Sequence, residues 1–62
     1  MEMKPATLRR IRAKTRLTQV QMAEKLMMSR RAYQALELGE VRIKGPVLIP
    51  LTMLAKELDI HE

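Results

Sequence analysis

Residues 17–40 read LTQVQMAEKLMMSRRAYQALELGE, and this stretch predicts two short helices joined by a very tight turn. Thr18 and Gln21 are spaced as a capping box, in which each side chain bonds a backbone amide at the start of a helix. Ser29 has the residue type that caps the next helix. Only two methionines separate the two predicted helices. So short a connection prevents an antiparallel pair, and the helices must therefore cross steeply.

Caps and apolar spacing predict four helices in all. Thr7 is a suitable N-cap for the first, because Pro5 prevents that helix from extending further back. Leu51, Leu54 and Leu58 recur at helical spacing in the last. The chain is therefore expected to be an all-α single domain over residues 1–62, in which the middle pair forms a helix-turn-helix. The four helices are expected at about 8–16, 18–26, 29–37 and 48–58.

Charge is unevenly distributed along the 62 residues. Residues 1–46 carry eleven Lys and Arg against four Glu, a net charge of +7, whereas residues 47–62 have a net charge of −2. The basic part suggests an anionic partner, and the apolar, mildly acidic tail suggests a protein contact. Seven arginines against five lysines favour bidentate recognition of phosphates or guanines.

The composition also limits the possible classes of function. With no cysteine and one histidine, the chain lacks the ligands for a disulfide framework or a zinc site. Its carboxylates are scattered, and it has no phosphate-binding glycine loop or nucleophile elbow, which argues against an enzyme, a cofactor and a small-molecule substrate. The longest apolar run is too short for a signal sequence or a membrane span. A cytoplasmic protein with no membrane partner is therefore expected.

One face of the helix predicted at 29–37 carries Arg30, Arg31, Gln34 and Ala35, and we expect this face to be exposed. An arginine at a helix N-terminus is unfavourable by roughly 0.3–1 kcal/mol in solvent. It becomes favourable where that helix end meets the phosphates and acceptor-rich groove of DNA. Arginine can bond guanine, glutamine can bond adenine, and an alanine methyl can touch the thymine methyl. We interpret the four residues as base contacts; the alternative is that the arginines only keep an exposed helix soluble.

The stretches LRRIRAKTRLTQVQMAEKL, SRRAYQALELG and LTMLAKELDI resemble the Xre/Cro phage-repressor type of helix-turn-helix over about residues 8–60. The resemblance implies a compact lambda-repressor-like domain of four to five helices that binds double-stranded DNA. It also implies an ion pair between Arg12 and Glu37, and a phosphate contact from Gln19 with its backbone amides. We expect further phosphate contacts from Thr18, Arg16, Arg42 and Lys44.

Met27 departs from this resemblance, because the family usually places a glycine at the end of the second helix. If this residue must adopt a left-handed conformation, methionine costs about 1–2 kcal/mol relative to glycine. The orientation of the following helix therefore depends on the conformation of this turn.

A single recognition helix makes few base contacts. We therefore expect a homodimer that reads an inverted repeat with half-sites about 34–36 Å apart. The apolar residues after position 40 are the candidate dimer interface: Val41, Ile43, Val47, Leu48, Ile49 and Ile60. An alternative that fits the sequence equally well is that these residues close the core of the monomer.

These observations predict a sequence-specific DNA-binding transcriptional regulator, a repressor that occupies an operator. The resemblance implies a small protein of a phage or mobile element, an autorepressor of the kind also found beside anti-CRISPR genes. The alternative is an antitoxin-type protein, which represses its own operon and uses its apolar tail to bind a toxin.

Overall fold

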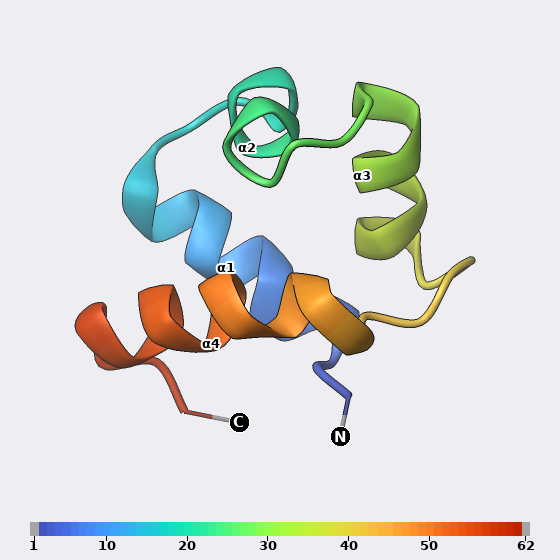
Figure 1. Cartoon of the computed structure of the whole chain (residues 1–62). Helices are drawn as coiled ribbons and strands as arrows, with labels where there is room; N and C mark the ends of the chain where they lie inside the picture. Colours follow the sequence, from blue (N-terminus) through green and yellow to red (C-terminus); the bar gives the residue numbers. More distant parts are fainter. Residues whose placement is uncertain (1, 62) are drawn as a thin grey trace.

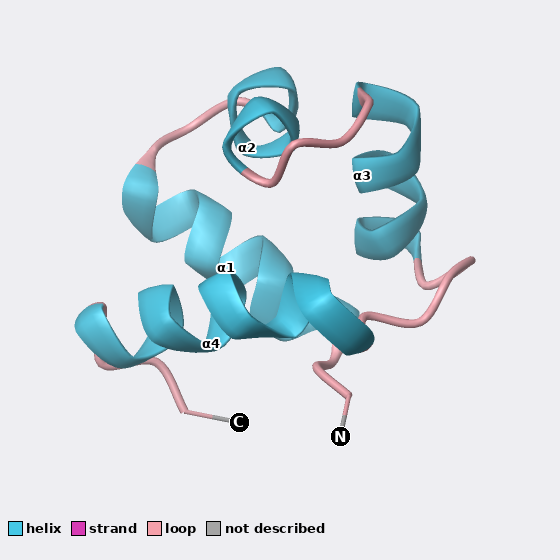
Figure 2. Ribbon diagram, viewed as in Figure 1, coloured by secondary structure: helices cyan, strands magenta, loops and turns pink. Residues whose placement is uncertain are grey.

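The computed structural model describes residues 2–61 and contains four α-helices, which are α1 (Pro5–Thr15), α2 (Gln19–Lys25), α3 (Arg30–Leu38) and α4 (Leu48–Glu57). A single 3₁₀ turn, η1 (Gly45–Val47), precedes α4. Figure 2 shows helices and loops but no strand among the described residues, and the only β-type pairing there is one isolated bridge. The predicted all-α class is confirmed. The last three helices begin and end within one residue of the expected positions.

The first helix begins earlier than expected. Thr7 is not its N-cap but a buried residue of the first turn, 4% exposed. Pro5 occupies the first helical position, where no amide donor is needed. The carbonyl of Lys4 accepts hydrogen bonds from the amides of Thr7 and Leu8, at 3.0 and 3.2 Å. The predicted start was wrong because a proline that prevents backward extension can itself be the first residue of a helix.

In Figure 1, α2 and α3 lie above α1 and α4. α2 is seen almost end-on and α3 from the side, so the two helices cross steeply, as their short connection requires. α4 runs along the lower side of the molecule, next to α1, and both ends of the chain lie on this side. None of the helices within residues 2–61 is long and apolar enough to cross a membrane.

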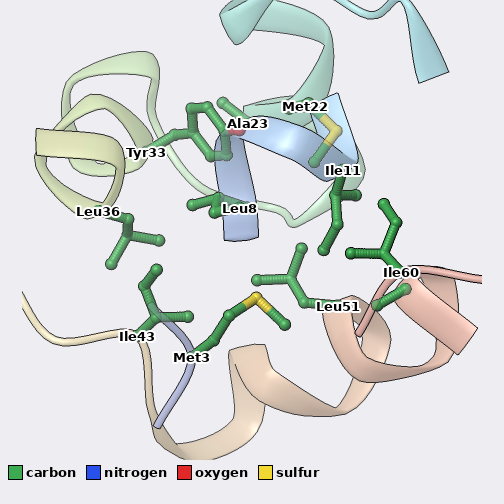
Figure 3. Close-up of a cluster of buried hydrophobic side chains, with 11 residues drawn as sticks. Met3, Leu8, Ile11, Met22, Ala23, Tyr33, Leu36, Ile43, Leu51 and Ile60 are labelled. Atoms are coloured by element: carbon green, nitrogen blue, oxygen red, sulfur yellow. The ribbon is translucent and has the colours of Figure 1, made fainter. Parts of the chain in front are cut away.

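One hydrophobic core fills the space between the four helices (Figure 3). Because each helix is short, no single pair of helices can form the core, and all four contribute to it. Segments near both ends of the chain complete it. The buried apolar residues are Leu8 and Ile11 of α1, Met22 and Ala23 of α2, Tyr33 and Leu36 of α3, and Leu51 and Ala55 of α4, with Met3, Ile43 and Ile60.

Two of the six candidate dimer residues lie in this core, which corrects that part of the prediction. Ile43 is 1% exposed and Ile60 is 5% exposed. The carbonyl of Ile43 accepts a hydrogen bond from the amide of Met3 at 3.0 Å, so the isolated bridge holds the loop against the core. Both isoleucines therefore pack mainly within the monomer, and Ile60 keeps only a small exposed surface.

Ile60 returns to the core through a left-handed turn at the end of α4. Asp59 has a φ of 58°, and the amide of Ile60 bonds the carbonyl of Ala55 at 2.8 Å. This is the pattern by which a helix end satisfies its last carbonyls and brings an apolar residue back onto its own last turn. Of the other candidates, Val47 and Leu48 pack partly buried against the core, while Val41 and Ile49 remain exposed.

Candidate nucleic-acid interface

The start of α2 is held by the capping box expected from the sequence. The Thr18 hydroxyl accepts a hydrogen bond from the Gln21 amide at 3.1 Å, and the Gln21 side chain accepts one from the Thr18 amide at 2.8 Å. Two amides that a helix start leaves without partners are satisfied in this way. The position of α2 after the loop is therefore specified by local chemistry.

The turn between α2 and α3 contains a left-handed methionine. Met27 has a φ of 58°, and its side chain is almost fully exposed, at 94%. The Met28 amide bonds the Ala23 carbonyl at 2.9 Å, which closes the end of α2. The Ser29 hydroxyl then accepts a hydrogen bond from the Ala32 amide at 3.1 Å and starts α3. The turn thus has a left-handed conformation that glycine adopts without strain and that costs methionine about 1–2 kcal/mol.

The first two residues of α3 are exposed arginines. Among residues 2–61, no ion pair or hydrogen bond engages the side chain of Arg30 or Arg31. The opposite face of the helix holds Tyr33, Leu36 and Glu37, all buried. Packing on that face fixes the helix, so both guanidinium groups are presented to solvent at its positive N-terminal end.

The rest of the exposed face of α3 differs in detail from the expectation. Gln34 and Ala35 are only half-buried rather than fully exposed. Ala32 is exposed as well, because it lies at the edge of the face that carries Tyr33 and its methyl group is too short to reach the core. Leu38 is 63% exposed and lies on the same face as Arg31, so this face also carries a large apolar side chain.

A buried carboxylate joins α1, α2 and α3 behind this face. Glu37, 3% exposed, accepts hydrogen bonds from Arg12 Nε at 2.6 Å and Arg12 Nη2 at 3.3 Å. It also accepts one from Gln19 Nε2 at 3.2 Å and one from the Tyr33 hydroxyl. A guanidinium nitrogen of Arg9 donates to the backbone carbonyl of Glu37. This one side chain therefore sets the position of α3 relative to the two preceding helices.

The electrostatics of this cluster favour the ionised carboxylate. Burial alone would raise the pKa of Glu37, but hydrogen bonds from Arg12, Tyr33 and Gln19, with the charge of Arg12, outweigh burial and lower it. Burial and the bond to Glu37 raise the pKa of Tyr33, and the bond to Glu37 raises the pKa of Arg12. At neutral pH the cluster is therefore a carboxylate, a guanidinium and a protonated phenol.

We expect the stability that Glu37 contributes to disappear in acid. Its folded-state pKa is below the ordinary value of 4.5, so the contribution is complete above that value and is lost as the pH falls through the folded-state pKa. Urea denaturation of the wild type and Glu37→Gln at a series of pH values tests this. The difference in unfolding free energy should be constant near neutral pH and shrink below about pH 4.5. A difference independent of pH would contradict it.

The cluster changes what Gln19 can offer to DNA. Its side-chain amide donates one of its two hydrogens to Glu37, so the second hydrogen and the backbone amide are the donors left for a phosphate. The Thr18 hydroxyl accepts a hydrogen bond in the capping box and keeps its own hydrogen to donate to a phosphate. Arg16 is exposed just before α2 and adopts a left-handed conformation, with a φ of 60°.

The two other expected phosphate contacts lie outside the α2–turn–α3 unit. Arg42 and Lys44 are exposed on the loop that follows α3. Arg42 Nε lies 3.5 Å from a carboxylate oxygen of Glu2, and both side chains remain accessible to solvent. Such an exposed ion pair is weak, so Arg42 can exchange Glu2 for a phosphate at little cost.

Comparison with known proteins agrees with this geometry. A family model described as a helix-turn-helix domain matches residues 6–56, which include all of α2, the turn and α3. No curated protein and no solved structure matches the chain. Within residues 2–61, no group of three or more His, Asp or Glu side chains is placed to hold a metal ion.

Proposed function

Because the chain belongs to the helix-turn-helix domain family, we propose that it is a sequence-specific DNA-binding transcriptional regulator that places α3 in the major groove. The observation that carries this proposal is the pair of exposed, unpartnered arginines at the start of α3. Cations at a positive helix end are unfavourable in solvent and favourable against phosphates and guanine edges.

The proposed base contacts are Arg30, Arg31, Gln34 and Ala35. The arginines are the principal readers, because they are fully presented, whereas Gln34 and Ala35 are half-buried and reach only a base edge that comes close to the helix. Leu38 supplies an apolar contact on the same face. Arg16, Arg42, Lys44, the Thr18 hydroxyl and the backbone amide of Gln19 contact phosphates. These contacts position α3 without specifying sequence.

The finer biological assignment extends the same proposal. The protein acts as a small repressor of the Xre/Cro type, encoded by a phage or mobile element, and binds an inverted repeat as a dimer. One copy presents a single helix of nine residues to the groove, which makes few base contacts. A second copy is therefore needed for the affinity that specific DNA sites usually have.

Replacing either Arg30 or Arg31 with alanine should weaken binding to the selected operator by about 1–3 kcal/mol and relax specificity at one base-pair position. The operator is first obtained by selecting bound fragments from a random duplex pool. Binding of each variant to the operator and to a random duplex is then measured by fluorescence anisotropy at several salt concentrations.

Two matched charge-removing variants make this test specific. Arg16→Gln should weaken operator and random duplex alike and reduce the salt dependence by about one phosphate contact. Arg10→Gln should change neither, because its guanidinium donates to the backbone carbonyl of His61, on the side of the chain ends. If neither α3 variant altered discrimination between operator and random duplex, the base-reading assignment would be wrong.

A further inference from the structure

The outward face of α4 is apolar although it faces solvent. Leu51 is fully buried, and at 100° per residue Ile49 and Met53 each lie about 160° away from it. They are 66% and 60% exposed and form a ridge one helical turn apart. A helix that is apolar on opposite sides is normally covered on both.

An apolar groove runs along one side of this ridge. Met3, Ala55 and Ile60, all buried core residues, are among those that line it, together with Leu48 and Thr52 of α4. The ridge of Ile49 and Met53 forms the outer edge of the same groove. A ridge and a groove therefore lie side by side on one surface, which we call the α4 face.

We propose that the α4 face binds the α4 face of a second copy of this chain, with the two α4 helices antiparallel. A two-fold interface uses the same patch on both subunits, so the patch must be complementary to itself. The α4 face meets this condition, because the ridge of each copy can enter the groove of the other, as side-chain ridges do when helices pack.

The charges at the two ends of α4 favour the antiparallel arrangement. Lys44 is exposed just before the N-terminal end. At the C-terminal end the exposed charges are Lys56, Glu57 and Asp59, a net charge of −1. Antiparallel pairing brings Lys44 of each copy towards the acidic end of the other. It also places the positive N-terminal end of each α4 beside the negative C-terminal end of the other, which is favourable. A parallel pair would place like ends together.

The size of the surface predicts a weak dimer. A standard interface covers about 800 Å² of each partner, about a sixth of the 4577 Å² accessible surface of this chain. The α4 face therefore has to be used over its whole width, including the residues from the chain ends that line the groove. We expect a dissociation constant of micromolar order, at the weak end of the range for interfaces of this size.

The position of the α4 face is compatible with DNA binding by both copies. α4 lies along the lower side of the molecule in Figure 1, below α2 and α3, so a copy added there leaves α3 uncovered. Each copy measures 27 × 25 × 18 Å, so two copies joined through α4 are together long enough to span two half-sites. Half-sites one turn apart need about 34–36 Å. This last step rests on the proposed function, whereas the contact itself does not.

Sedimentation equilibrium of the protein without DNA tests the contact. The wild type should show a reversible monomer–dimer equilibrium, and Ile49→Glu or Met53→Glu should raise its dissociation constant at least tenfold, because each buries a charge in the contact. Val41→Glu, at an equally exposed apolar residue outside the α4 face, should leave the constant unchanged. All of these side chains are exposed, so thermal melts should confirm that the variants fold.

Engineered cysteines test the antiparallel orientation, since the chain has none of its own. Under mild oxidation, an equal mixture of Ile49→Cys and Met53→Cys chains should form the mixed disulfide in preference to either homodimer, because antiparallel α4 helices place position 49 opposite position 53. Preferential cross-linking of each variant to itself would overturn that orientation.

Three further results would overturn the proposal. These are a wild-type chain that stays monomeric up to millimolar concentration, a dimer that Val41→Glu disrupts and Ile49→Glu does not, and an Ile49-dependent complex that forms only with a different protein. Binding of monomeric Ile49→Glu to a single half-site measures the proposed function separately. Loss of dimerisation with retained half-site recognition would therefore be distinguishable from failure of the DNA-binding proposal.

Discussion

Replacing Arg12 with methionine is expected to lower the free energy of unfolding by about 3–5 kcal/mol, towards the lower end of that range. The substitution preserves an unbranched side chain but leaves the Glu37 carboxylate, 4% exposed, without its only cationic side-chain partner among the described residues. Gln19 and Tyr33 still donate to it, which moderates the loss. A domain of 62 residues has a total stability of only about 3–9 kcal/mol. The variant should therefore be partly unfolded at physiological temperature.

Urea denaturation followed by circular dichroism measures this loss. The matched control is Glu40→Gln, which removes an exposed carboxylate two residues beyond α3 and should change stability by less than about 0.5 kcal/mol. Equal shifts in the two variants would contradict the importance of the pair. Because the cluster also positions α3, folded Arg12→Met at low temperature should bind operator DNA more weakly than its stability alone would require.

Leu51→Ala is expected to destabilise the protein by about 2–5 kcal/mol. Leu51 is fully buried and points from α4 into the core between α1 and the returning chain end (Figure 3). Removing it leaves a cavity, and the thin core of so small a domain has few neighbours that can collapse into the space. The expected result is a large fall in the urea midpoint, with an unchanged slope if the variant still folds in two states.

Ile49→Ala on the same helix is the control for Leu51→Ala. Both changes shorten an aliphatic side chain of α4, but Ile49 is exposed, so at concentrations where the chain is monomeric its loss should cost less than about 0.5 kcal/mol. Similar losses at the two positions would mean that α4 doesn't pack on the core through Leu51. If the two losses of unfolding free energy become similar only at high protein concentration, the loss in Ile49→Ala would instead report on the α4 face.

Local signals were sufficient for much of the helix-turn-helix. Thr18 with Gln21 and Ser29 define helix starts through bonds within one turn, so their patterns can be read without knowledge of the rest of the chain. The exposed arginines of α3 follow from helical periodicity in the same way. The same reasoning misplaced the start of α1, because a proline that prevents backward extension can also be the first residue of a helix.

Long-range packing decided the parts of the site that local patterns left open. The sequence allowed Ile43 and Ile60 to be either core or dimer interface, because an apolar side chain gains similar free energy in either place. The tertiary structure places both in the monomer core, Ile43 through its bridge to Met3. The bond from the Gln19 side chain to Glu37, between residues 18 positions apart, was likewise outside the reach of local patterns.

The sequence by itself determined the presence of four helices, the caps of α2 and α3, the tight turn and the arginine-bearing face of α3. Each of these depends on interactions between residues within four positions of one another. Only the tertiary structure decided how Glu37 joins three helices, which isoleucines close the core, and that Ile49 and Met53 of α4 remain uncovered. These features depend on which surfaces meet in space, and burial of apolar area is non-directional, so the same residue pattern is compatible with several arrangements until packing selects one.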